Sequence, residues 1–261
     1  MRQIVFGLSA LVFCAGSAFA VPVMHVHDSS GNLATVDVQT GTVSVIGNMG
    51  AVFTDIAFDT SGDLYGITFT GLYSINPTTA VATFIGPTGL SGGNALVFDS
   101  NDTLYAASNN TLGIYTLNTG TGASTLLGNT GFASGGDLAI HSGKLFLASS
   151  TNQLVELNLA DLPESQSVGP FGVGNVFGLA TGDDGFLYGV AGTNIYTVNP
   201  LTGAATLAIN YGGQGLGQAF GQSFTTEAVQ GEIPPIPEPS TYVMMGLGLL
   251  GFGLMIRRRR G

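Results

Sequence analysis

The sequence predicts an all-β protein, a ring of five four-stranded antiparallel sheets that together form a five-bladed β-propeller. The first observation is a repeat: one pattern of alternating strand and polar turn recurs, with starts 39, 42, 40 and 41 residues apart. The second is that no stretch between residues 21 and 232 shows sustained helical periodicity. The copies of the pattern occupy residues 33–41, 72–80, 114–122, 154–162 and 195–203.

Each copy contains a strand that enters a turn of the Asn-x-x-Thr-Gly type, and another alternating strand follows the turn. A second hairpin precedes this one in four of the units and ends on an aromatic residue. Two hairpins in about 40 residues make a four-stranded sheet, which is the size and strand count of a propeller blade. The second hairpins occupy residues 56–65, 96–105, 138–146 and 179–188.

A single sheet of this size cannot bury both of its faces, so we expect neighbouring blades to pack against each other. The first unit lacks its opening strand, and residues 218–224 have strand character. We therefore expect one blade to combine residues 22–50 with residues 218–228, which closes the ring and buries the sheet edges. An open stack or a β-solenoid is the alternative. The expected core residues include Ile56, Phe58, Leu96, Phe98, Leu138 and Ile140.

The composition provides apolar surface for a core and excludes several partners. The 261 residues are 44% hydrophobic and only 8% charged. Residues 21–236 contain 15 acids and a single base, Lys144, a net charge of −14. This charge repels phosphate backbones and anionic headgroups, which excludes nucleic acid binding. The one cysteine, Cys14, precedes this region, so the domain has no thiol for disulfides, catalysis or metal binding.

The N-terminus has the three parts of a secretory signal peptide. Arg2 gives a positive start, residues 4–14 form a short apolar run, and Ala18-Phe19-Ala20 is a small-x-small cleavage site. We predict that signal peptidase removes residues 1–20 and that the mature chain begins at Val21. A first transmembrane helix is the alternative, but the apolar run is too short for one.

The C-terminus predicts a membrane anchor in three parts: a Pro-rich linker (231–241), a transmembrane helix (242–256) and a basic tail (257–261). Fifteen apolar residues span about 22 Å as a helix, which makes the anchor a weak one. By the positive-inside rule the basic tail stays in the cytoplasm and the preceding domain lies outside. The basic cluster that would stop transfer is Arg257, Arg258, Arg259 and Arg260.

Pro237, Glu238 and Pro239 precede this short apolar segment and its arginine cluster. The arrangement resembles the PEP-CTERM sorting signal of exported bacterial proteins, over about the last 25 residues of the chain. The resemblance implies recognition by an exosortase, removal of the anchor, and delivery to the surface or extracellular matrix of a Gram-negative bacterium. A plain single-pass tail anchor is the alternative.

Two pairs of residues are candidates for metal binding. His25 and His27 would point to the same face of a strand and could share zinc or copper, although no third ligand is identifiable. We expect them instead to be two exposed histidines on the ring-closing blade. Asp55 and Asp137 occupy equivalent positions early in predicted inner strands, where they could face the central channel and bind Ca²⁺.

The remaining motifs favour structural roles. Residues 89–93 match G-x-S-x-G but lie in a glycine-rich connector, and residues 246–251 match G-x-G-x-x-G inside the anchor. His141 is expected to be solvated beside a turn. Asp, Asn and Gly in three equivalent acidic turns are the residues that tight turns require. These turns are residues 59–63, 99–102 and 182–185.

The sequence favours a non-catalytic function: an exported propeller that binds exopolysaccharide or another surface component, with no bound cofactor. The alternatives are a Ca²⁺-dependent propeller hydrolase or lactonase that uses Asp55 and Asp137, and a purely structural matrix protein. The lack of a coherent catalytic set in the residues favours the first hypothesis. The expected partners are signal peptidase and exosortase during export.

Overall fold

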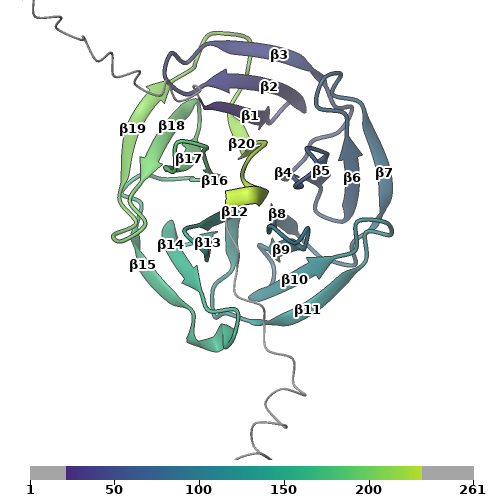
Figure 1. Ribbon diagram of the computed structural model, residues 1–261, viewed down its shortest axis with the longest axis vertical. Helices are drawn as coiled ribbons and strands as arrows, with labels where there is room; N and C mark the ends of the chain where they lie inside the picture. Colours follow the sequence, from purple (N-terminus) through teal and green to yellow (C-terminus); the bar gives the residue numbers. More distant parts are fainter. Residues whose placement is uncertain (1–21, 231–261) are drawn as a thin grey trace, which may run out of the picture.

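The structure, a computed structural model, describes residues 22–230, which form a closed ring of five four-stranded antiparallel sheets (Figure 1). The predicted five-bladed β-propeller is confirmed. The predicted signal peptide, sorting motif, transmembrane segment and arginine tail lie outside the described residues. Within residues 22–230, no helix is long and apolar enough to cross a membrane.

The four strands of each blade are arranged side by side in order from the central axis to the rim. We number the blades in chain order, starting from the one that contains the N-terminal strands. The innermost strands of blades 1 to 5 are β20 (Ala219–Ser223), β4 (Asp55–Phe58), β8 (Gly93–Phe98), β12 (Ser134–His141) and β16 (Gly178–Thr181). The second strands are β1 (Val23–Asp28), β5 (Leu64–Ile67), β9 (Leu104–Ser108), β13 (Lys144–Ser149) and β17 (Leu187–Ala191).

The outer half of each blade comes from the hairpin that contains the Asn-x-x-Thr-Gly type turn. The third strands are β2 (Asn32–Asp37), β6 (Gly71–Ile75), β10 (Gly113–Leu117), β14 (Gln153–Leu157) and β18 (Asn194–Val198). The outermost strands are β3 (Val43–Asn48), β7 (Ala82–Pro87), β11 (Ser124–Asn129), β15 (Gln166–Pro170) and β19 (Ala205–Asn210). Two single-turn 3₁₀ helices, η1 (Leu162–Glu164) and η2 (Ala228–Gln230), complete the elements of the described chain.

The two ends of the described chain close the ring, as the sequence predicts. β20 pairs antiparallel with β1, with Val26 opposite Gln222 and His25 opposite Ser223. Blade 1 therefore takes its innermost strand from the C-terminal end of the propeller and its other three strands from the N-terminal end. This pairing ties the first and last blades together and leaves no blade without its inner strand.

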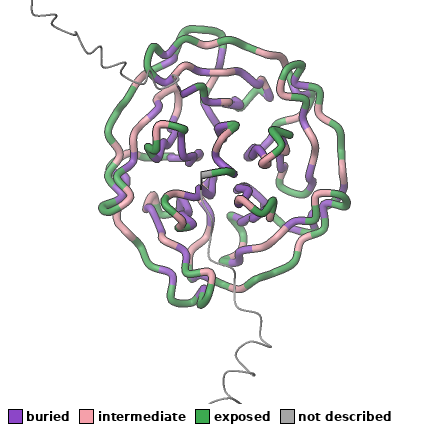
Figure 2. Tube along the Cα trace, viewed as in Figure 1, coloured by how far each residue is buried: buried purple, intermediate pink, exposed green. Residues whose placement is uncertain are grey.

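Five separate hydrophobic clusters hold adjacent blades together, one at each interface. The burial pattern shows the same arrangement, with buried residues on the inner strands and exposed residues on the rim and turns (Figure 2). The largest aromatic side chains in these clusters, such as Phe53 and Tyr211, are fully buried. All six core residues named from the sequence are no more than 1% exposed: Ile56, Phe58, Leu96, Phe98, Leu138 and Ile140.

At the rim, glycines in the outermost strands allow neighbouring blades to touch through their backbones. A Cβ at Gly86 in β7 would overlap the carbonyl oxygen of Thr121, which lies in the outer turn of the next blade. Gly122 in that turn has φ +78° and contacts Gly86 in return. Gly169 in β15 makes the same kind of contact with Thr202. The outer strand of one blade thus packs against the Thr-Gly turn of the next, which explains why both recur in the sequence.

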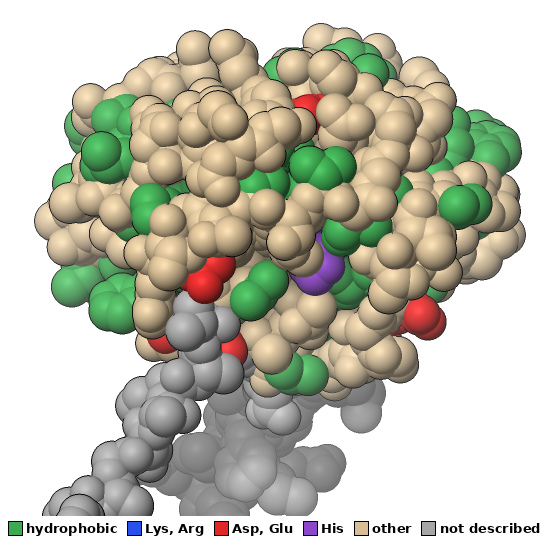
Figure 3. Space-filling view, turned by 90° about the horizontal axis from the view of Figure 1, so that it is seen from above, with side chains coloured by type: hydrophobic (Ala, Val, Ile, Leu, Met, Phe, Trp, Pro, Cys, Tyr) green, Lys and Arg blue, Asp and Glu red, His purple; other side chains and the backbone are tan. Residues whose placement is uncertain are grey.

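The two faces of the disc differ in charge. The turns that join the first and second strands of each blade lie on one face, and the chain also enters β1 and leaves β20 on this face. We call it the hairpin face. The exposed acids of the turns gather there, and Figure 3 shows most of the visible acidic side chains along one border of the disc. Toward the opposite face, the acids Asp28, Asp55 and Asp137 of the described residues are all buried.

We predict that Gly86→Ala lowers the free energy of unfolding by about 1–3 kcal/mol, because the added methyl group would force blades 2 and 3 apart. Urea unfolding followed by circular dichroism measures this change. Gly120→Ala is the control, because a Cβ there meets nothing closer than 3.4 Å and the change should stay within about 0.5 kcal/mol. Equal stability of the two variants would contradict the close backbone contact between Gly86 and the turn of the next blade.

Candidate functional site

Asp55 and Asp137 meet at the propeller axis, where both are fully buried and hydrogen-bonded to each other. Asp55 accepts a hydrogen bond from the backbone N–H of Ile56 at 2.8 Å and from that of Leu96 at 2.6 Å. Leu96 belongs to β8, the inner strand of the next blade. The expected position of Asp55 at the channel is therefore confirmed, and its carboxyl group joins blades 2 and 3.

Asp137 repeats this arrangement two blades further on. Its two oxygens accept from the backbone N–H groups of Leu138 and Leu179, each at 2.6 Å, and Leu179 lies in β16 of the next blade. Burial raises the pKa of Asp55 well above its ordinary value. Burial and the charge of Asp55 do the same for the pKa of Asp137. Two adjoining buried carboxyls cannot both ionise at low cost, so the pair shares a proton.

A third buried acid, Glu227, was missed by the sequence reasoning. It lies between β20 and η2, and its carboxylate accepts from the backbone N–H of Thr181 at 3.3 Å and from the Ser223 hydroxyl at 3.1 Å. Burial raises its pKa well above the ordinary value, and the charge of Asp55 contributes to the shift. No spacing rule marks an acid that follows the last strand, so only the closed ring brings Glu227 to the axis.

The prediction that His25 and His27 are exposed is wrong. His27 is completely buried and His25 is only half-exposed, whereas we expected two exposed side chains. Their strand, β1, lies second from the axis and is covered by β20 and by neighbouring blades. Burial lowers the pKa of His25 to about 4 and that of His27 to about 3, although the charge of Asp28 partly opposes the shift for His27. Both imidazoles are therefore neutral at neutral pH.

The axial residues do not converge as metal ligands. Among residues 22–230, no three His, Asp or Glu side chains are arranged as a metal site requires. Each oxygen of Asp55 already accepts a backbone hydrogen bond, so a cation would have to compete with those donors. Calcium at Asp55 and Asp137, and zinc or copper at His25 and His27, remain predictions.

The other motifs lie as follows. Residues 89–93 run between β7 and β8, where Ser91 hydrogen-bonds Asn110 rather than a histidine. In the acidic turns, Asp59 and Asp99 accept hydrogen bonds from backbone N–H groups two and four residues later, which is the predicted turn role. His141 differs from expectation: it is half-buried at the end of β12 and contacts the Thr181 hydroxyl at 3.4 Å.

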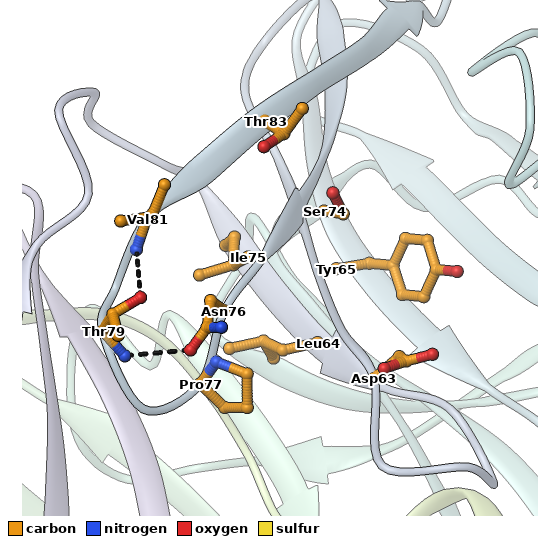
Figure 4. A pocket seen from close by; sticks show the side chains of 10 residues that line it. All are labelled: Asp63, Leu64, Tyr65, Ser74, Ile75, Asn76, Pro77, Thr79, Val81 and Thr83. Carbon is orange, nitrogen blue, oxygen red and sulfur yellow. Dashed lines mark hydrogen bonds between the residues drawn. The ribbon is translucent and has the colours of Figure 1, made fainter.

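An open groove of about 610 Å³ lies along blade 2, at the hairpin face (Figure 4). Tyr65 presents its ring there, with the Asp63 carboxylate on one side and the hydroxyls of Ser74 and Thr83 on the other. These residues share one face of the blade, because Tyr65 pairs with Ser74 and Ser74 with Thr83 across the strands. Apolar and amide side chains complete the lining: Leu64, Ile75, Asn76, Pro77, Thr79 and Val81.

Tyr65 differs from its counterparts in the other blades. Tyr105 and Tyr188 are each 5% exposed, and their hydroxyls are bonded to Asp99 at 3.5 Å and Asp184 at 2.7 Å. Tyr65 is half-buried, and no group within residues 22–230 hydrogen-bonds its hydroxyl. The sequence shows the aromatic repeat but not this difference, which depends on where the turn acids point. The groove therefore offers an aromatic ring and a free hydroxyl that the other blades do not.

Comparisons with known proteins agree with both parts of the chain. Residues 235–260 match the PEP-CTERM protein-sorting motif. The chain is thus an exported protein that an exosortase processes and sorts to the cell surface. The comparison with curated proteins finds no match.

Two solved structures share the propeller fold. One is a chain in a nidogen/laminin complex, with a TM-score of 0.55, 14% identity, and coverage of 81% of this chain and 100% of that one. The other comes from work on the de novo evolutionary emergence of a symmetrical protein, with a TM-score of 0.50, 21% identity, and coverage of 83% and 100%. At these identities the likeness concerns the fold alone.

The raised pKa of Glu227 predicts a pH dependence. The folded protein keeps a proton that the unfolded chain, with a glutamate pKa of about 4.3, releases, so the free energy of unfolding falls as pH rises above that value. Glu227→Gln removes the charge and can still bond Thr181 and Ser223. We expect it to be about 2 kcal/mol more stable than the wild type at pH 8, and to differ less at pH 5.

Urea unfolding at both pH values measures this difference. Glu164→Gln is the matched control, because Glu164 is exposed in η1 and its replacement should change stability at neither pH. A Glu227→Gln variant that is less stable than the wild type at pH 8 would contradict the conclusion that folded Glu227 holds a proton.

Proposed function

We propose that the propeller is a non-catalytic module that binds polysaccharide at the cell surface or in the extracellular matrix of a Gram-negative bacterium, after transient anchoring in the inner membrane by residues 242–256. The observation that carries this proposal is the blade 2 groove. A sugar ring has apolar C–H faces that pack on an aromatic ring, and hydroxyls that bond carboxylates, amides and hydroxyls. Tyr65, Asp63, Ser74 and Thr83 offer this combination on a rigid sheet.

The burial of the axial acids argues against a catalytic role for them. Asp55, Asp137 and Glu227 are fully buried, and their oxygens accept hydrogen bonds from the chain itself. A substrate could reach them only if the closed ring opened. The groove, in contrast, has an acid and hydroxyls, but no histidine is among the residues that line it. We therefore infer no hydrolase or lactonase activity for this domain.

We expect the purified protein to co-sediment with the exopolysaccharide of its own bacterium, and Tyr65→Ala to weaken this binding at least fivefold by removing the ring from the groove. Tyr196→Ala is the matched control, because Tyr196 is also a half-buried tyrosine but lies in blade 5, outside the groove. Circular dichroism confirms that both variants fold. Equal binding by the two variants, or no binding by the wild type, would contradict the proposal.

Processing at the C-terminus is tested separately. We expect the mature protein from its own bacterium to begin at Val21 and to lack the arginine cluster of residues 257–260. Replacing the central acid of the sorting motif, Glu238→Ala, should leave the cluster in place. Intact-mass spectrometry of both proteins gives the answer, and a wild-type product that retains the arginines would exclude removal of the anchor.

A further inference from the structure

We propose that the blade 2 groove selects a glycan with free amino groups, such as a polymer of glucosamine, over neutral or acidic glycans. This inference rests on the proposed function, because it specifies which polysaccharide the same groove takes. It follows from the open groove, from the half-buried ring and unbonded hydroxyl of Tyr65, and from the charges of the nearby acids.

The groove has the size and chemistry of a saccharide site. Its volume of about 610 Å³ lies within the range of small-molecule sites. The Tyr65 ring packs against the ring of Phe98 of the next blade, with centroids 5.2 Å apart and the planes tilted by 57°. A ring that is held in place loses little entropy on binding, so it can serve as a stacking platform.

Three carboxylates from two blades, those of Asp59, Asp63 and Asp102, are close enough to Tyr65 for their charges to act on it. Asp63 lines the groove, and no group within residues 22–230 bonds its carboxylate. Asp102 comes from blade 3 and is fixed by the backbone N–H and hydroxyl of Thr60, at 3.0 and 2.7 Å. Burial raises the pKa of Tyr65, and the charges of Asp59, Asp63 and Asp102 raise it further. The potential at the tyrosine is therefore negative.

No positive side chain offsets this potential. Lys144 is the only base among the described residues, and it is paired with Glu156 at 2.8 Å in blade 4. An ammonium group over the Tyr65 ring would gain a cation–π interaction and the attraction of the Asp63 carboxylate. A uronic acid in the same place would be repelled by all three acids. An N-acetylated sugar would keep the stacking but lose the charge.

The test compares a glucosamine hexamer, its N-acetylated counterpart and a hexamer of uronic acid by isothermal titration calorimetry at about pH 6, where amines of this type are protonated. We expect the glucosamine hexamer to bind at least tenfold more tightly than the N-acetylated one, and the uronic acid hexamer not to bind. Because the attraction is electrostatic, raising the salt from about 50 to about 300 mM should remove most of the preference.

Asp63→Asn should lower the affinity for the glucosamine hexamer about fivefold and leave the affinity for its N-acetylated counterpart unchanged. Asp161→Asn is the matched control, because Asp161 is an exposed turn acid of blade 4 with no side-chain capping bond. An equal loss in both variants would show diffuse attraction to an acidic surface and overturn the proposal. Equal affinity of the wild type for the amino and N-acetylated hexamers would overturn it as well.

These outcomes separate the two proposals. If the protein binds its own exopolysaccharide through Tyr65 but shows no preference for amines, the amino-sugar inference fails and the proposed function stands. If neither the exopolysaccharide nor any of the three hexamers binds, both fail together.

Discussion

The structure depends on how the inner edges of its blades are satisfied at the axis. The innermost strand of each sheet has one edge without a neighbouring strand, and its N–H groups point into a closed channel. Carboxylates accept these hydrogen bonds: Asp55 bonds Leu96, Asp137 bonds Leu179 and Glu227 bonds Thr181. An unpaired buried N–H would cost about 1–3 kcal/mol, so each acid stabilises the neighbouring blade as well as its own segment. Burial of these acids makes their ionised forms unfavourable, and their raised pKa values reflect this.

The repeat makes this arrangement possible because it is imperfect. At the inner-strand position of Asp55 and Asp137, the other three blades have Ala95, Gly178 and Gly221. A Cβ at Gly221 would lie 2.5 Å from both the Asp55 carboxylate and the His27 imidazole, so the small residues provide the space that the acids occupy. The same reasoning applies at the hairpin face, where Tyr65 is left without the intramolecular partner that Tyr105 and Tyr188 have. Deviations from the repeat thus mark the residues with specific roles.

The sequence predicted the ring, the blade boundaries, the closing strand and the core, because these follow from strand alternation, turn residues and a period of about 40 residues. It also placed Asp55 and Asp137 at the channel. It could not predict the burial of His25 and His27, since alternation fixes the face of a strand but not what covers it. Glu227 and the Tyr65 groove were equally hidden, because each depends on contacts between segments that are distant in sequence. The position of His141 beside Thr181 of the next blade is a third example.

Closure by β20 has a consequence for the order of events during export. Blade 1 needs residues 219–223, which are among the last of the propeller to be synthesised, and Glu227 reaches the axis only after them. While the chain is still crossing the membrane, four blades can assemble, but the sheet that joins them has no inner strand and a row of N–H groups stays open to water. The disc is therefore completed in one late step, close to the moment when the sorting signal itself becomes available to the exosortase.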